Sequence, residues 1–298
     1  MRAACGMLIA LMAIAGGCAA ESSGYRPPYK VEYAKPRKAP VPYAQIVRNY
    51  NPRVQSLERL RAPITLVVDS PGETDGRRTD QVEGSFQFMR PSSVALRLDK
   101  VGETLAYLGS NDAEYWWIEL KDGKRAQVGS HALATPRSAA RFGVPVHPLD
   151  LIDLMGVLPL PESPKGVRTR WTDDGNEIAV ILPARGAGWG ERRIYIDPAT
   201  WRPTRTEILD ARAAIVAYAE LSRYLQVAVR GEPNSPAMLA SRYELVIPIE
   251  DTNVTVTVAS PENPKERLRL GGFNLQALLD SYGVTDVERI DEPAKEHP

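Results

Sequence analysis

Short runs of alternating apolar and polar residues recur along this 298-residue chain and constrain its fold more than any other feature. Val94, Leu96 and Leu98, for example, alternate with alanine, arginine and aspartate. A period of two is typical of a strand with one buried face. The same alternation returns at 243–249 and 254–258. The sequence therefore predicts a mainly β protein.

Turn residues separate the β-prone runs, and one proline-rich insertion interrupts them. The predicted strands are 64–68, 82–89, 94–98, 104–108, 115–120, 125–128, 167–171, 177–182, 192–196, 205–209, 214–229, 242–249 and 254–258. Apolar residues at helical spacing predict a helix over 43–60, kinked before Pro52. Further helices are expected at 138–142, 149–155 and 274–282. This order favours a single curved antiparallel sheet broken by one helical insertion.

The start of the chain has the pattern of a bacterial lipoprotein signal. Arg2 is the only charge before Cys18, which follows an apolar run at 7–14 and small residues at 15–17. We expect 1–17 to be removed and Cys18 to be acylated, which anchors the chain in a membrane. Ala19, in place of aspartate, favours the outer membrane. A transmembrane anchor over 3–20 and an ordinary cleaved signal are the alternatives.

The remaining chain divides by composition. Residues 18–42 hold the acylated cysteine and a tether rich in proline and basic residues, which cannot bury a core. One domain is expected over 43–285, followed by a polar C-terminal tail over 286–298. Cys5 leaves with the signal, so the mature domain has no cysteine for a disulfide or for a cysteine-based metal site.

Charge and motif content argue against several classes of function. The chain carries 37 basic and 37 acidic residues, so nothing favours nucleic-acid binding. His131 and His147 lack metal-ligand spacing, His297 lies at the end of the chain, and no G-x-S-x-G motif occurs. We therefore expect neither an enzyme nor a bound cofactor or metal.

Aromatic residues concentrate on three neighbouring predicted strands, between Phe86 and Trp117. Trp116 and Trp117 are adjacent, so their rings must point to opposite faces of the sheet. Two interpretations stay open: ordinary core packing, or an apolar pocket on the concave side. Polar atoms are scarce on these strands, so such a pocket would suit acyl chains better than sugars.

Several segments, taken in order, resemble the LolA/LolB superfamily of lipoprotein carriers. They are GSFQFMRP at 84–91, LRL at 96–98, LGSND at 108–112, WW at 116–117 and YIDPATWRPTRTEILD at 195–210. The order of elements is also similar: an N-terminal helix, strands, a helical plug and more strands. The resemblance covers about 43–260.

This resemblance implies an open half-barrel, with helices packed on the concave face and covering a cavity for lipoprotein acyl chains. Arg90 matches the arginine that holds the lid closed in the soluble carriers. Val101 matches the exposed apolar loop residue of the lipid-anchored receptors, where leucine is usual. The expected cavity-lining residues are Phe86, Phe88, Leu96, Leu98, Tyr107, Trp116 and Trp117.

The sequence thus favours a lipid-anchored lipoprotein at the outer membrane, facing the periplasm and binding acyl chains during lipoprotein sorting or insertion. Its expected partners are acyl chains or lipoproteins, the membrane through Cys18, and a periplasmic carrier protein. We expect a monomer. The alternative is a structural or envelope-stress-sensing module of the same fold with a filled cavity, since fold alone does not fix function.

Replacing Cys18 tests the anchor. Cys18→Ala should abolish labelling by a metabolic fatty-acid probe, because no other cysteine remains to form the thioether after processing. Cys5→Ala is the matched control and should label normally. Labelling that persists in Cys18→Ala would contradict the lipoprotein interpretation.

Overall fold

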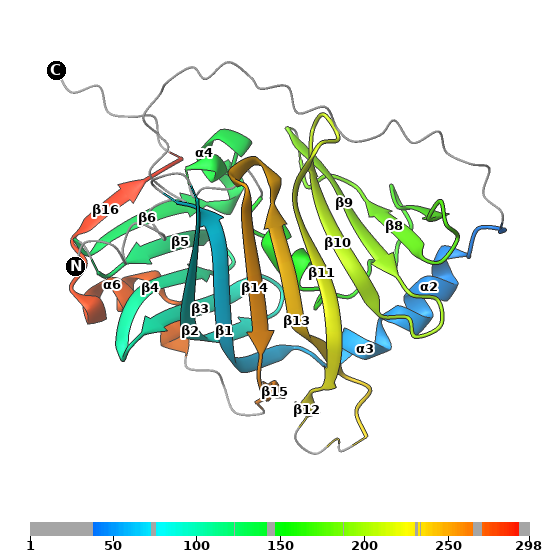
Figure 1. Ribbon diagram of the computed structural model, residues 1–298, viewed down its shortest axis with the longest axis horizontal. Coiled ribbons are helices and arrows are strands. Elements are labelled where there is room, and N and C mark those ends of the chain that lie inside the picture. Colours follow the sequence, from blue (N-terminus) through cyan, green and yellow to red (C-terminus); the bar gives the residue numbers. More distant parts are fainter. Residues whose placement is uncertain are drawn as a thin grey trace.

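The computed structural model describes residues 38–72, 76–121, 123–141, 147–186, 188–229, 232, 234–264 and 270–291. Cys18 and most of the predicted tether lie outside these residues. The described chain forms one sheet of 16 strands (Figure 1). Its main path runs β16-β6-β5-β4-β3-β2-β1-β14-β13-β11-β10-β9-β8-β7, with β12 and β15 paired beside it.

The strand bounds follow the predicted alternation closely. They are β1 Arg59–Pro71, β2 Arg77–Met89, β3 Ser93–Lys100, β4 Glu103–Ser110, β5 Glu114–Glu119, β6 Arg125–Ser130, β7 Arg168–Trp171, β8 Ile178–Leu182, β9 Trp189–Ile196, β10 Pro203–Asp210, β11 Ile215–Gln226, β12 Ala228–Val229, β13 Met238–Ile247, β14 Thr252–Val258, β15 Glu262–Asn263 and β16 Asp286–Arg289. The run predicted as one strand over 214–229 is divided into β11 and β12.

The helices of the described residues are short and lie in four parts of the chain. They are α2 Tyr43–Tyr50, α3 Pro52–Gln55, η1 His131–Leu133, α4 Pro136–Ala140, α5 Asp150–Leu154, η2 Pro248–Glu250, η3 Leu270–Phe273 and α6 Leu275–Tyr282. The break predicted before Pro52 separates α2 from α3. Proline at the first position of α3 has no N–H to donate, so it suits a helix start.

Neighbouring strands along the main path are antiparallel except for β16 and β6, which run parallel. The sequence analysis assigned residues from Asp286 onward to a polar tail. In the structure, Asp286–Arg289 instead form β16 and extend the sheet. Their side chains are exposed, which explains why their composition resembles a tail.

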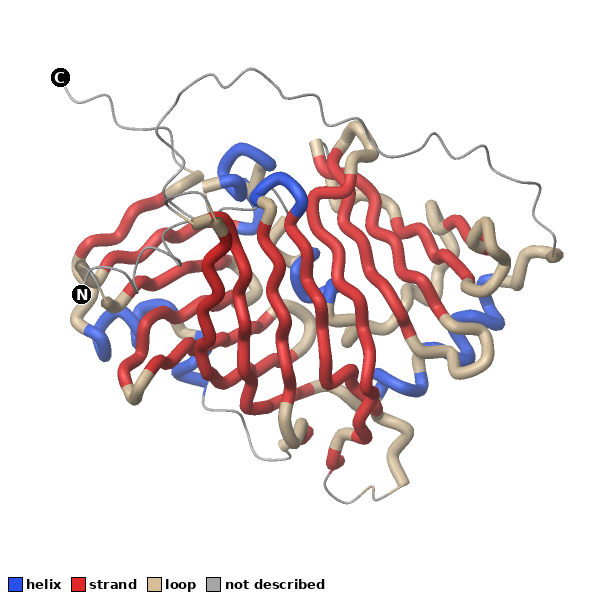
Figure 2. Tube along the Cα trace, viewed as in Figure 1, coloured by secondary structure: helices blue, strands red, loops and turns tan. Residues whose placement is uncertain are grey.

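The sheet curves without closing, and helices fill its concave side (Figures 1 and 2). Apolar side chains of α2, α3 and α5 pack with one face of both halves of the sheet in a single core. Ile46, Tyr50 and Val54 come from the N-terminal helices, and Ile152 and Leu154 from α5. The predicted half-barrel with helices on the concave face is therefore confirmed.

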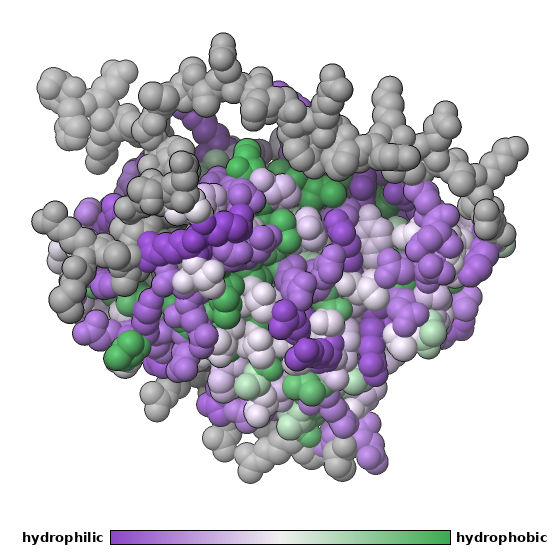
Figure 3. All heavy atoms as spheres, in the orientation of Figure 1, coloured by the Kyte–Doolittle hydropathy of each residue, from purple (hydrophilic) through white to green (hydrophobic). Residues whose placement is uncertain are grey.

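A smaller core lies on the opposite face. Leu275, Leu278 and Leu279 of α6, with Phe273 of η3, cover β3 to β6 there. The outer surface of the sheet turned to the viewer in Figure 3 is mostly hydrophilic, with smaller hydrophobic groups between. The sheet thus buries apolar side chains on both faces at its β3–β6 end and mainly on the concave face elsewhere.

Truncating Phe88 tests the concave core. Its side chain is fully buried, so Phe88→Ala should lower the free energy of unfolding by about 3–5 kcal/mol. Ile249→Ala, at a residue that is 74 % exposed, should change it by no more than about 0.5 kcal/mol. Denaturant unfolding of both variants measures the difference. Equal effects would contradict this account of the core.

Candidate ligand site on the concave face

Five of the seven predicted cavity-lining residues share the concave face. Strand pairing sets Phe86 opposite Leu96, and Gly84 of β2 opposite Leu98. Phe86 and Phe88 belong to the main core, so their rings pack with the helices. Trp117 points to the same face, because it pairs with Leu108, which in turn pairs with Leu96.

Tyr107 and Trp116 lie on the other face. Both pack in the smaller core with α6, so they do not line the concave surface. The close approach of Trp116 requires a glycine on β4, since a Cβ at Gly109 would lie 2.3 Å from the indole ring. This difference from the sequence analysis arises because α6 folds back over the outer face and buries the rings there.

The middle of the concave face carries apolar side chains that are only partly covered. We call this set the concave strip; its members are Leu66, Leu96, Leu108, Leu245 and Val256. They come from five strands, β1, β3, β4, β13 and β14. Strand pairing sets Leu66 opposite Val256 and Leu96 opposite Leu108. The strip offers an apolar surface that the protein's own side chains cover incompletely.

Arg90, the predicted lid residue, binds the end of α3. Its guanidinium donates to the carbonyl oxygens of Val54 and Gln55, the latter at 3.4 Å. Its backbone N–H donates to the carbonyl of Glu58 at 3.0 Å. Burial lowers the pKa of the guanidinium, and the Glu58 carboxylate partly offsets this effect. Arg90 therefore connects the end of β2 to a helix that packs on the concave core.

Residues that the sequence analysis did not single out fix the C-terminal end of α5. Arg53, which is buried, donates to the carbonyl oxygens of Gly156 at 2.7 Å and Met238 at 3.1 Å. Thr206 of β10 donates to the carbonyl of Leu154 at 2.9 Å. Because helix ends leave carbonyls without helical partners, these donors hold α5 in place.

Two aspartates and two arginines, the α5 charge cluster, hold the helix from its other side. Arg185 contacts Asp150 and lies 2.8 Å from Asp153. Arg192 lies 2.5 Å from Asp153 and 3.5 Å from Asp150. Burial raises the pKa of Asp150 to about 6, and the Asp153 carboxylate adds to this effect. In the sequence, the pattern that could have indicated this cluster is the spacing of Asp150 and Asp153, which places both on one side of a predicted apolar helix.

Val101 stands at the tip of the β3–β4 hairpin and is 96 % exposed. Its φ is 51°, in the left-handed region that β-branched residues rarely adopt. Gly102, at φ 82°, completes the turn. Such strain persists where the surrounding structure imposes it, and it is concentrated at functional sites. Figure 1 shows this hairpin at an edge of the molecule.

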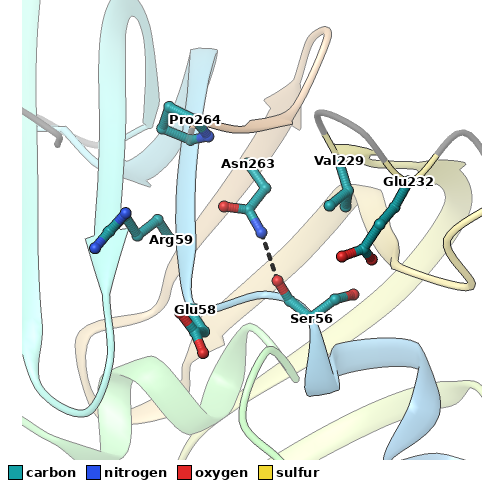
Figure 4. Close-up of a pocket in the computed structure, with 7 residues that line it drawn as sticks. All are labelled: Ser56, Glu58, Arg59, Val229, Glu232, Asn263 and Pro264. Atoms are coloured by element: carbon teal, nitrogen blue, oxygen red, sulfur yellow. Dashed lines mark hydrogen bonds between the residues drawn. The ribbon is translucent and has the colours of Figure 1, made fainter. Parts of the chain in front are cut away.

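A polar pocket of about 260 Å³ lies elsewhere, beside the β12–β15 pair (Figure 4). Its lining residues are Ser56, Glu58, Arg59, Val229, Glu232, Asn263 and Pro264. The Asn263 amide donates to the carbonyl of Ser56 across it. Its carboxylates and its arginine do not suit an acyl chain.

The described residues contain no group of three or more histidine, cysteine, aspartate or glutamate side chains placed to hold a metal ion. None of their helices is long and apolar enough to cross a membrane.

Comparison with known proteins identifies the fold. No family model matches the sequence, and no curated protein does. A protein from Vibrio parahaemolyticus named for outer membrane lipoprotein sorting superposes with a TM-score of 0.53 at 12 % identity, covering 79 % of this chain and 97 % of its own. A DUF1329 family protein from Desulfovibrio piger gives 0.52 at 10 % identity, with the same coverage. The predicted LolA-like fold is confirmed, and at these identities the likeness shows the fold alone.

Replacing Arg90 tests its hold on α3. Arg90→Ala should lower the free energy of unfolding by about 1–3 kcal/mol, because it leaves two helix carbonyls without a donor. Amide exchange in 43–57 should accelerate. The matched control is Arg97→Ala, which removes an exposed ion pair with Asp99 worth at most about 1 kcal/mol. Unchanged exchange in Arg90→Ala would show that Arg90 does not secure the helix.

Proposed function

We propose that this protein is a lipid-anchored envelope lipoprotein that binds acyl chains on its concave face during lipoprotein sorting or insertion at the outer membrane. The concave strip is the observation that carries the proposal. Its five apolar side chains are partly exposed beside fully buried residues of the same face. Apolar surface of this kind, backed by a packed sheet, suits a ligand held by burial.

The arrangement of the lid supports a carrier or receptor. Arg53, Arg90 and Thr206 hold the helices by hydrogen bonds to backbone carbonyls. Such contacts break and form without rearranging the sheet, so helices can move while the strands keep their pairing. The protein named for lipoprotein sorting has the same fold, which agrees with this use.

The β3–β4 hairpin, with Val101 at its tip, offers a second apolar surface to a lipid or acyl chain. An exposed valine in a strained turn contributes nothing to the core, so we assign it to contact with lipid or an incoming acyl chain. Cys18 acylation would hold the domain near the membrane. The proposal includes no catalysis and no cofactor.

A sensing or structural module of the same fold is the second candidate. The extent of the main core favours it, because helices α2, α3 and α5 already fill much of the concave face. Binding of an acyl probe to the concave face is expected of a carrier or receptor and is not expected of a sensing or structural module with a filled face.

Ligand binding can be measured with a fluorescent fatty acyl probe titrated into the full-length protein in detergent micelles. Saturable binding is expected, and Leu108→Glu should weaken it at least tenfold, because the acyl chain would meet an unpaired charge. Leu225→Glu, at a residue 41 % exposed on β11, is the control for added charge. Absence of saturable binding would support the sensing or structural module.

The hairpin is tested by two substitutions of Val101. Val101→Glu should impair lipoprotein transfer to the protein while changing its melting little, because the side chain is exposed. Val101→Asn should also impair transfer, and it should stabilise the turn because asparagine tolerates a positive φ. Val101→Leu should retain transfer. Normal transfer by the glutamate and asparagine variants would remove the hairpin from the mechanism.

A further inference from the structure

Two histidines lie beside the α5 charge cluster, and neither takes part in the proposed acyl contact. The rings of His131 and His147 stack with centroids 6.2 Å apart and an interplanar angle of 20°. His147 also meets the ring of Trp189 edge-on at 5.1 Å. His147 lies three positions before the first residue of α5, whereas His131 belongs to η1 after β6. The pair therefore joins α5 to the opposite half of the sheet.

The hydrogen bonds of the two imidazoles indicate where their protons lie. His147 Nδ1 accepts the backbone N–H of Leu149 at 3.2 Å, so this nitrogen carries no proton. His131 Nε2 lies 3.0 Å from the carbonyl oxygen of Asn111, which only accepts, so the proton of His131 is on Nε2. Protonation of His147 at Nδ1 would break its bond to the start of α5.

The α5 charge cluster ties the whole of α5 to the sheet, so we expect the helix to move as one unit. Each aspartate lies within 4 Å of both arginines, so the four charges are neutralised as a set. When α5 moves away, all four groups gain water together. The apolar residues Ile152 and Leu154 on the same helix would leave the core in such a movement and uncover part of the concave face.

We propose that α5 is a gate over the concave face that opens when His147 and His131 take up protons. A proton on either ring adds a positive charge beside Arg185, and one on His147 also faces Arg192. The negative groups facing His147 and His131 are Asp153 and Asp112, respectively. This inference rests on the proposed function of the concave face and adds its regulation.

The direction of the pH effect follows from the closed and open states. Burial lowers the pKa of His147 to about 4 in the closed state, and Arg185 and His131 add to the effect. Burial also lowers the pKa of His131, while the Asn111 carbonyl opposes this change. In the open state both return to the ordinary value of about 6.5. Acidification below that value therefore favours opening.

Asp150 acts in the opposite direction at lower pH. Because its pKa is raised to about 6 in the closed state, protonation of Asp150 favours closure. Between about pH 7.5 and about pH 6, His147 alone should raise the ratio of open to closed states about fourfold. Asp150 should reduce this gain by about twofold. The effect of histidine protonation on opening is therefore best measured above pH 6, where Asp150 opposes it least.

Hydrogen exchange of the ligand-free, full-length protein in detergent micelles tests the gate. Protection of 150–157, corrected for the intrinsic pH dependence of exchange and compared with β13, should fall at least about twofold between about pH 7.5 and about pH 6. His147→Asn should flatten this fall, since the asparagine oxygen can still accept the Leu149 N–H without titrating. His131→Asn provides a second, independent variant. Asp150→Asn should steepen the fall, because it removes the opposing group.

The proposal is overturned if wild-type α5 keeps its protection relative to β13, or if both histidine variants lose protection as steeply as the wild type. No acyl ligand is present in this measurement. Failure of the gate is therefore distinguishable from failure of acyl binding, which the probe titration reads separately at about pH 7.5.

Discussion

The sheet of this protein curves but does not close, and this leaves an apolar concave face that must be covered. Strands β1, β2 and β14 on one side and β8 to β10 on the other contribute side chains to one core. Helices α2, α3 and α5 are too short to be stable alone, and they gain their stability by packing on this face. The position of every lid helix therefore depends on the burial of the concave surface.

Polar contacts then decide where the helices lie. Arg53 reaches the carbonyl of Gly156, 103 positions along the chain, and Arg185 reaches Asp150 across 35 positions. Apolar packing is tolerant of small shifts, whereas these hydrogen bonds and ion pairs are directional. The lid helices α2, α3 and α5 are thus held by apolar packing on the sheet and positioned by a few hydrogen bonds and ion pairs. The proposed movement of α5 would break these few polar contacts and requires no change in strand pairing.

The sequence predicted what depends on local pattern. Alternation located the strands, Pro52 located the break between α2 and α3, and adjacent positions placed Trp116 and Trp117 on opposite faces. It could not predict which tryptophan faces the concave side, because that depends on where α6 packs. The α5 charge cluster was also missed, since its arginines come from a distant hairpin. Strand β16 was missed because its side chains are exposed and polar.

Photocrosslinking can locate an acyl chain bound on the concave strip. A fatty acid carrying a diazirine near its methyl end would be irradiated with the full-length protein, and the labelled peptides identified by mass spectrometry. We expect labels in peptides from β3–β4 and β13–β14, competed by unlabelled fatty acid. Labels confined to the outer face beneath α6, or labels insensitive to competition, would contradict this expectation.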